Sequence, residues 1–365
     1  MTLEALTGRL CLYPGRRPAI ACERPIVGAD LLGRLTRDRP VARVPDLLAS
    51  VFTLCADAQR STARRALQAA LGQAAAPGEH AADARRQALH VAREHLQRLA
   101  LDLPVRMGAA PAQAGWLSGA PVAALDRLPE EGLPGAASAL PAWLHSDLLG
   151  LPAAAWLEAW QRDAGEWLSR WCGQHEHPVT RWLRAVKSEA QAVGWNCRVL
   201  DPADPHEVGM IAAAVEADAG FASAPVWQGA PAETGPWTRS ACIDPVFSAW
   251  DRLGARIADL VRIALGHRLS QGALPLTEGV GLAWTEMSRG LLMHWVQLEP
   301  GERLAETARV ARYQVLAPTE WNFHPEGALA KWLGAGAASA AQVRVAAAAL
   351  DPCIEFSLDE APSHA

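Results

Sequence analysis

Side chains that can bind a metal ion stand in several places in this sequence. Seven cysteines are scattered along the chain, and one of them, Cys172, is followed closely by His175 and His177. Thiolates and imidazoles are common metal ligands, but no second ligand pair follows at zinc-motif spacing, so we interpret this segment as a polar loop. His90 and Glu94 are neighbours at i and i+4 of a predicted helix, where they could share a metal ion. The many arginines of that helix favour a solvated face instead.

Two of the other cysteines stand in segments with a recognisable residue order. The segment 52–59 reads FTLCADAQ and the segment 351–356 reads DPCIEF; between them lie 286–295, EMSRGLLMHW, and 318–322, PTEWN. The first two resemble the CGxCxxxH and DPCxxC motifs of the large subunit of nickel–iron hydrogenases. The two middle segments are similar to the EAPRGxxxHW strand and the PTxWN motif of that family. Because all four occur in the family's order, the resemblance covers most of the chain.

Several ligand positions of these motifs hold other residues in this chain. By the resemblance, Cys55 corresponds to a bridging thiolate of the nickel–iron centre and Cys353 to a terminal nickel ligand. Phe52 and Phe356 stand at the positions of the other two thiolates, and Gln59 replaces a histidine that orients the ligands. The match is therefore closest to the shorter, cysteine-depleted paralogues of the large subunit, the HupK/HoxV-type hydrogenase expression and formation proteins.

This resemblance implies a role in cofactor assembly rather than in hydrogen turnover. Two thiolates should not hold a stable binuclear centre, but they can hold one iron whose other positions are filled by cyanide and carbon monoxide. We therefore expect a transient iron–dicyano–carbonyl unit, without nickel, at Cys55 and Cys353. Arg289 is expected either to donate hydrogen bonds to cyanide or to form an ordinary salt bridge. The other residues expected around this pocket are Phe52, Gln59, Asp351 and Phe356, with Asp351 either capping backbone amides or accepting from Arg289.

Three functions compete. The preferred one is a non-enzymatic scaffold or carrier that binds a small HypC-type chaperone and passes the iron unit to the hydrogenase large subunit or its precursor. The second is a structural paralogue without metal, which keeps the large-subunit shape to bind hydrogenase subunits or chaperones during assembly. The third, an active hydrogenase, is disfavoured by the missing ligands.

Composition argues against several other classes of protein. Half of the 365 residues are hydrophobic, which allows a large core, and the net charge of −5 comes with scattered Lys and Arg. This pattern offers no basic stripe for nucleic acid and no polybasic membrane anchor. No secretory signal and no apolar run of about 20 residues is visible. An odd number of scattered cysteines suits reduced thiols, so the cytoplasm is the expected compartment.

The elements expected to position the two cysteines are mainly helices. Residues 44–71 have apolar residues at helical spacing and place Cys55 on an apolar face, where a lone cysteine is by itself an ordinary core residue. Ser339 is expected to cap a final helix over 340–350, which stops before Pro352 and delivers Cys353.

Further helices are predicted in the middle of the chain. One covers 79–101, and another is capped by Asp244 and Pro245 and ends at Gly266. A helix that opens at Pro152 carries four tryptophans on one stripe, which we interpret as a core or helix-packing surface. These tryptophans are Trp156, Trp160, Trp167 and Trp171.

Two β-hairpins complete the prediction. One spans 7–27 with a turn at Pro14 and Gly15, and its Cys11 and Cys22 are interpreted as buried structural thiols. The other spans 289–317 with a turn at 299–302, and the PTEWN segment closes it. The expected fold is mainly α with small β-hairpins near both ends, similar to a hydrogenase large subunit. We expect a single domain over 1–365, with a loop-like surface excursion over 104–141.

Overall fold

The fold is mainly helical, with small sheets, as the sequence predicts. The computed structural model describes residues 8–24, 31–73, 77–200, 205–239, 246–301, 304–336 and 338–358. Within these ranges no helix combines the length and the apolar character needed to cross a bilayer.

A four-stranded antiparallel sheet carries the third motif. Its strands follow chain order: β5 (Gln271–Thr277), β6 (Val280–Met287), β7 (Gly290–Leu298) and β8 (Val310–Leu316). β6 and β7 are buried almost throughout, because apolar clusters cover both faces of the sheet. Strands covered on both faces have continuous apolar runs instead of alternation. The hairpin predicted over 289–317 is thus confirmed as β7 and β8, but it is only half of the sheet.

Two details of that hairpin differ from the prediction. Residue 302 of the predicted turn lies outside the described residues, and the connection is longer than a tight turn, since the next backbone pairing joins Glu299 N to Arg309 O. The PTEWN segment forms the short helix α16 (Pro318–Asn322) and does not close the hairpin. Proline at the first helical position explains this start, because its fixed φ suits the first turn.

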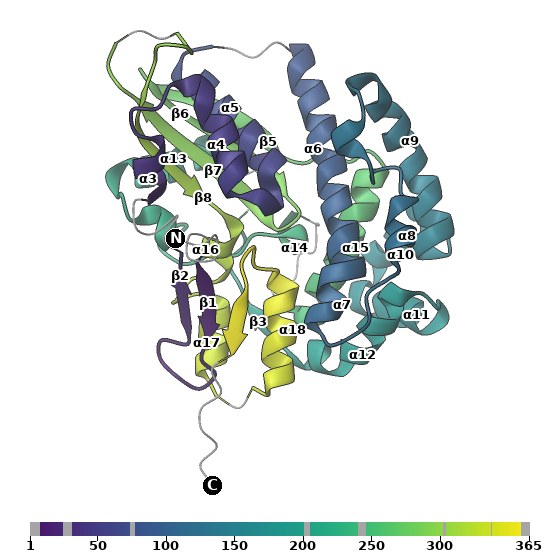
Figure 1. Ribbon diagram of the computed structural model, residues 1–365. Coiled ribbons are helices and arrows are strands. Elements are labelled where there is room, and N and C mark those ends of the chain that lie inside the picture. The colour runs from purple at the N-terminus through teal and green to yellow at the C-terminus, as the bar shows by residue number, and fades with distance from the viewer. Residues whose placement is uncertain are drawn as a thin grey trace.

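The helix predicted over 44–71 is interrupted just before its cysteine. α4 (Val44–Val51) ends at Phe52, whose ψ of 64° is not helical, and the short turn η2 (Thr53–Cys55) leads into α5 (Ala56–Ala70). Figure 1 shows α4 and α5 lying across the four-stranded sheet, and α5 contacts β6 and β7. Cys55 therefore stands at the N-terminal end of α5.

A helical layer makes up the other side of the molecule, with α6 (Pro77–Gln97) and α15 (Ala249–Ala264) in contact near its centre (Figure 1). The helix predicted over 79–101 is confirmed, and it runs through a π-helical turn, Arg98–Asp102, into α7 (Leu103–Arg106). α15 buries most of its surface and begins with Ser248 as its N-cap. The cap predicted at Asp244 and Pro245 lies outside the described residues.

The tryptophan helix is two helices. α10 (Ala153–Arg162) and α11 (Ala164–Gln174) are separated by Asp163, whose φ of −161° breaks the helix. The tryptophans meet across this break: Trp156 stacks on Trp160 at 5.8 Å and meets Trp171 edge-on at 5.7 Å. The packing interpretation is confirmed, while the single helix is wrong.

The segment 104–141 is not the loop that its Gly, Pro and Ala content predicts. It contains α8 (Ala114–Ser118) and most of α9 (Leu133–Leu144), and Val122, Leu125 and Leu140 are buried in the main apolar core. Alanine and leucine favour helix strongly enough to outweigh the scattered glycines.

A three-stranded sheet joins the two ends of the described chain. The predicted first hairpin is β1 (Arg9–Leu12) and β2 (Ile20–Glu23), and β9 (Phe356–Leu358) adds to β1 in parallel. α18 (Ala340–Leu350) precedes β9 and is capped by Ser339, as predicted. The α-helices and strands of the described residues not yet mentioned are α3 (Leu31–Thr36), α12 (Pro178–Ala192), β3 (Gly194–Asn196), α13 (Pro205–Ala217), α14 (Pro236–Arg239), β4 (Val246–Ser248) and α17 (Ala328–Gly334).

Candidate metal centre

Cys55 lies in an apolar setting at the start of α5. Its thiol is 7% exposed and belongs to the apolar cluster beneath the four-stranded sheet, together with Phe52. Gln59, one turn further along α5, points its side-chain amide at the sulfur, with Nε2 3.6 Å from Sγ. Gln59 thus faces Cys55, as the sequence predicted, and it offers a weak hydrogen bond to sulfur.

The pKa of the Cys55 thiol depends on charged groups from distant parts of the chain, including Cys353 near the C-terminus. Burial, together with the charges of Cys353 and Glu94, raises the pKa of the Cys55 thiol to about 12, although Arg289 and the Gln59 hydrogen bond act to lower it. Cys353 and Arg289 therefore lie within electrostatic reach of Cys55. A thiol with such a pKa keeps its proton at neutral pH, so a metal ion has to displace that proton on binding.

Cys353 follows the last turn of α18 and is held by Thr319. The Thr319 hydroxyl lies 3.0 Å from Cys353 Sγ, and the backbone N–H of Cys353 donates to the same oxygen at 3.3 Å. Cys353 is half-buried, whereas Thr319 is buried. Thr319 belongs to the PTEWN segment, to which the sequence assigned no contact with the tail.

Asp351 anchors the tail through arginine side chains. It ends α18 in a left-handed conformation with φ 50° and is almost completely buried. Arg98 pairs with it, Arg256 Nη2 lies 3.1 Å from Oδ2, and Arg289 Nε lies 3.5 Å from the same oxygen. These three guanidinium groups hold the pKa of Asp351 well below its usual range against the effect of burial. The sequence left open whether Asp351 caps backbone amides or accepts from Arg289. In the structure its carboxylate pairs with Arg289 and with two further arginines.

Arg289 connects this anchor to the Cys55 side. Its Nη1 lies 3.4 Å from Glu94 Oε2, and Ser288 donates to the same carboxylate oxygen at 2.5 Å. Burial raises the pKa of Glu94, and Arg289 opposes that rise. Arg289 therefore forms the salt bridges that one sequence interpretation expected. Its Nε, nearly buried, has no hydrogen bond within the described chain.

Several members of this network were missed by sequence reasoning. They are Glu94, Arg98, Arg256, Ser288 and Thr319. One signal was available: α15 carries Arg252, Arg256 and Asp259 among the apolar residues of its buried surface. Charged residues are rarely buried unless they are paired, so such a face indicates buried ion pairs.

The two phenylalanines at the missing ligand positions lie in different surroundings. Phe52 packs in the cluster under the four-stranded sheet. Phe356 is half-buried in β9, packs against the main core, and has the guanidinium carbon of Arg106 5.8 Å from its ring centroid. The structure thus brings Cys55, Gln59, Arg289, Asp351 and Cys353 into one network of contacts and charges. It places the two phenyl rings in separate apolar clusters.

The other candidate ligands have structural roles. Cys172 is fully buried, His175 Nε2 lies 2.9 Å from the Leu148 carbonyl oxygen, and His177 Nδ1 accepts from Val179 N to cap α12. The solvated face predicted for His90 and Glu94 is wrong, because His90 is buried and pairs with Asp57 at 3.1 Å.

One group of possible ligands outside these motifs is already neutralised by an arginine. The ligand atoms of Asp57, His90 and Asp126 lie within 4.8 Å of one another. Arg93 pairs with Asp126 at 2.7 Å and lies 3.0 Å from His90 Nδ1. The Arg93 guanidinium group therefore already contacts these ligand atoms, and a metal cation would have to compete with it for them.

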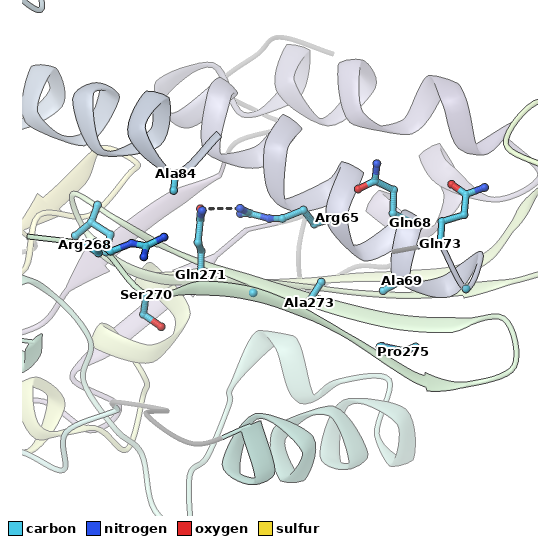
Figure 2. Close-up of a pocket in the computed structure, with 13 residues that line it drawn as sticks. Arg65, Gln68, Ala69, Gln73, Ala84, Arg268, Ser270, Gln271, Ala273 and Pro275 are labelled. Carbon is cyan, nitrogen blue, oxygen red and sulfur yellow. Dashed lines mark hydrogen bonds between the residues drawn. The ribbon is translucent and has the colours of Figure 1, made fainter. Parts of the chain in front are cut away.

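A large surface groove lies away from the cysteines. It has a volume of about 700 Å³ and runs between α5, α6 and β5, where Arg65 donates to Gln271 at 2.6 Å (Figure 2). Its described lining includes none of the seven residues that the sequence assigned to the metal site.

Comparison with known proteins first identifies the class. Residues 238–351 match the family model described as nickel-dependent hydrogenase. The structure resembles that of a [NiFeSe]-hydrogenase from Dm. baculatum, with a TM-score of 0.51, 12% identity, and coverage of 92% of this chain and 93% of the other. A Ni-Fe-Se hydrogenase from D. vulgaris Hildenborough gives a TM-score of 0.51 at 15% identity, over 88% of this chain and 90% of the other. The fold is therefore that of a nickel–iron hydrogenase large subunit.

Relatives of known name narrow the class to a family. The hydrogenase expression/formation protein HoxV of Cupriavidus necator is 38% identical over 98% of this chain and 97% of its own length. The protein HupK of Bradyrhizobium diazoefficiens is 30% identical over 90% of this chain and 89% of its own, and HupV of Azotobacter chroococcum is 31% identical over 94% and 92%. The chain belongs to the hydrogenase expression/formation proteins of the HoxV/HupK type. This membership supports an accessory role in hydrogenase maturation or assembly.

Proposed function

We propose that this protein is a scaffold or carrier for the iron–dicyano–carbonyl unit of nickel–iron hydrogenases, and that it holds the unit through Cys55 and Cys353 before delivery. The observation that supports this most directly is that Arg289 pairs with Asp351, two residues before Cys353, and that the charges of Arg289 and Cys353 both act on the buried Cys55 thiol. Soft thiolates suit iron, and the cyanide and carbonyl ligands complete its coordination. A site with few protein ligands releases its cargo readily.

The surrounding charges support an anionic cargo. Arg289 is nearly buried, lies within electrostatic reach of Cys55, and has an Nε–H without a hydrogen bond among the described residues. The only charged acceptor near this Nε–H in the described chain is Asp351 Oδ2 at 3.5 Å, so a cyanide nitrogen would give it a closer hydrogen-bond acceptor. Phe52 and Phe356, at the positions of the other two thiolates, offer no metal ligand, so nickel is not expected to bind stably. We therefore propose no hydrogen turnover for this protein.

The proposed partners follow from this cargo. A small HypC-type chaperone would bring the iron unit, and the hydrogenase large subunit or its precursor would receive it. Both would form transient complexes with this chain, because a carrier has to bind and release its cargo in turn.

The test is to purify the protein from a host that matures nickel–iron hydrogenase and to measure iron per chain together with cyanide and carbonyl infrared stretches. The intact protein is expected to carry both signals. Cys55→Ala and Cys353→Ala are expected to lose them and to impair hydrogenase maturation in cells, whereas Cys172→Ala, at a buried thiol with no role in the site, is expected to keep them. If both site variants mature hydrogenase normally, the protein is instead a structural paralogue that binds hydrogenase subunits or chaperones without metal.

A further inference from the structure

The two edges of the four-stranded sheet are covered differently. At one edge, β8 pairs with the chain before α4: Val310 N donates to Arg39 O at 3.1 Å, and Asp38 N donates to Val310 O at 2.9 Å. At the other edge, no further strand of the described chain pairs with β5, which borders the surface groove of about 700 Å³. An uncovered edge presents backbone N–H and C=O groups with which another chain can pair. The β5 edge therefore has the form of a docking site for an extended chain.

The register of β5 shows which of its backbone groups face away from the sheet. Ser270 O accepts from Glu286 N at 2.9 Å, so residue 270 bonds toward β6. The direction of hydrogen bonding alternates from residue to residue along an antiparallel strand, and the pairing with β6 is regular here. Gln271 and Ala273 therefore direct their N–H and C=O groups away from β6. No backbone group of the described residues pairs with them on that side.

The groove lies along these outward-facing positions. Gln271, Ala273 and Pro275 line it, and Figure 2 shows Arg268 near one end of this part of β5 and Pro275 toward the other. β5 is half-buried or exposed throughout, whereas β6 is buried throughout. Pro275 has no N–H to donate, so pairing along the edge has to stop there. An added strand can thus pair with the backbone of Gln271 and Ala273.

The side chains around this edge favour an acidic ligand. The groove continues toward α6 into a second cavity, and the exposed Arg268 lines both. Arg85 of α6 lines the second cavity, and neither arginine has a carboxylate partner in the described part of the chain. Arg65 lines the groove too, with its charge balanced by Asp83 at 3.0 Å. The described lining of the two cavities contains no aspartate or glutamate, although the whole chain has a net charge of −5. A cationic lining of this kind attracts anionic partners.

We propose that the β5 edge is a docking site for an extended, acidic segment of a partner protein. The segment adds to β5 as a strand: its backbone pairs with Gln271 and Ala273, and its carboxylates pair with Arg268 and Arg85. In this mode of recognition the main-chain hydrogen bonds provide affinity and the side-chain contacts provide specificity. The inference does not depend on the proposed iron site, because the described lining of the groove includes none of the residues assigned to that site.

A short fluorescein-labelled peptide of alternating valine and glutamate is the probe, and fluorescence anisotropy measures its binding to the intact protein. Arg268→Glu is expected to weaken binding at least about tenfold, because it places like charges opposite one another. Ala273→Pro is expected to weaken binding similarly, since it removes an outward N–H and keeps the bonds to β6. The matched control is Arg344→Glu, at an exposed arginine of α18 outside the groove, which is expected to bind as the original protein does. Thermal unfolding verifies that each variant is folded.

Hydrogen exchange followed by NMR distinguishes strand addition from a contact through charge alone. The amide protons of Gln271 and Ala273 are expected to exchange more slowly when the peptide is bound. The inference is overturned if the intact protein does not bind the peptide, if these two amides stay unprotected, or if Arg268→Glu and Ala273→Pro bind it as tightly as the original protein. Equal binding of the same peptide with lysine in place of glutamate would also overturn it.

Iron content separates this inference from the scaffold function. Arg268→Glu and Ala273→Pro protein, purified from the maturation-competent host, is tested for peptide binding and for iron in parallel with Cys55→Ala. Cys55→Ala is expected to lose iron and to bind the peptide normally, because Cys55 is outside the groove. If the original protein binds the peptide at β5 but carries no iron unit, the scaffold function fails and the docking site stands. Iron without peptide binding gives the opposite result.

Discussion

The two halves of the candidate site are held in place by different forces. Cys55 sits at the start of α5, in an apolar cluster pressed against the four-stranded sheet, and it is 7% exposed. Cys353 is half-buried and follows Asp351, which three arginines hold by charge. They come from the π-helical turn after α6, from α15 and from the β6–β7 turn. One half depends on packing and the other on buried ion pairs.

This difference predicts that the two halves respond differently to substitution. A close-packed helix and sheet resist local change, so the Cys55 half is expected to stay fixed. A buried ion network is strongly favourable only when every partner is present, so the Cys353 half is expected to respond sharply to the loss of one charge. The two halves can therefore be broken separately.

The largest effect is expected from Asp351→Asn. Asparagine keeps the shape but removes the charge that compensates Arg98, Arg256 and Arg289, and breaking a buried ion pair costs about 3–5 kcal/mol. Urea unfolding measures the loss. Glu158→Gln is the control, since the Arg162–Glu158 pair is more than 70% exposed on both sides and is worth well under about 1 kcal/mol. A loss at Asp351 as small as that of the control would show that charge does not hold this half.

The second largest loss of stability is expected from Gly281→Ala, in the packed half that contains Cys55. A Cβ at Gly281 would lie 2.3 Å from the Ala66 carbonyl oxygen and 2.5 Å from Ala70 N, both in the backbone of α5. Backbone cannot rotate away, so α5 has to move, and overpacking of this kind costs about 1–3 kcal/mol. The same substitution at Gly209 in α13 has open space and is expected to stabilise by about 0.5–1 kcal/mol. Equal effects of the two substitutions would contradict the close α5–β6 contact.

The pH dependence of the unfolding free energy below neutral pH tests the charged half through His95. This histidine contacts Arg256, which pairs with Asp351. This imidazole accepts from Arg256 at 3.2 Å and donates to Asp259 at 2.6 Å, so it is neutral, and burial lowers its pKa to about 4. The unfolded chain takes up this proton near pH 6.5 and the folded chain only near pH 4. Between these values His95 costs about 1.4 kcal/mol of stability for each unit that the pH falls.

His95→Gln should remove this contribution, so the difference from the original protein should shrink as the pH falls from 6.5 to 4. Unfolding curves at several pH values measure it. His267→Gln, at an exposed position, is the control. A difference between His95→Gln and the original protein that stays constant with pH would mean that His95 binds its proton equally in both states.

The smallest expected effect is that of Thr319→Val. Valine removes the hydroxyl that contacts Cys353 Sγ and accepts from Cys353 N, which costs about 1 kcal/mol, whereas Thr319→Ser keeps it. Reaction with a thiol reagent should become faster at Cys353 and stay unchanged at Cys55. Equal acceleration at both cysteines would mean that the two halves are not independent.

The sequence by itself determined the local elements and the motif positions. Helical periodicity located α6, α15 and α18, and four ordered motifs led to Cys55, Arg289 and Cys353 before any coordinates. These signals are local: a repeat of apolar residues reports which face of its own helix is buried. For the same reason the breaks at Phe52 and Asp163 were missed, because single residues with non-helical dihedrals leave the surrounding pattern nearly unchanged.

Only the tertiary structure decided how the pieces meet. β5 and β6 joined the predicted hairpin because strand pairing depends on partners elsewhere in the chain. Asp351 took Arg98 and Arg256 as partners because those side chains come from helices that converge on it, which no local spacing reveals. The cross-strand row of Cys22, Leu10 and Phe356 in the three-stranded sheet likewise exists only because β9 pairs with β1. Residue types can thus be read from the chain, whereas cross-strand register and buried charge partners are set by the long-range packing of the fold.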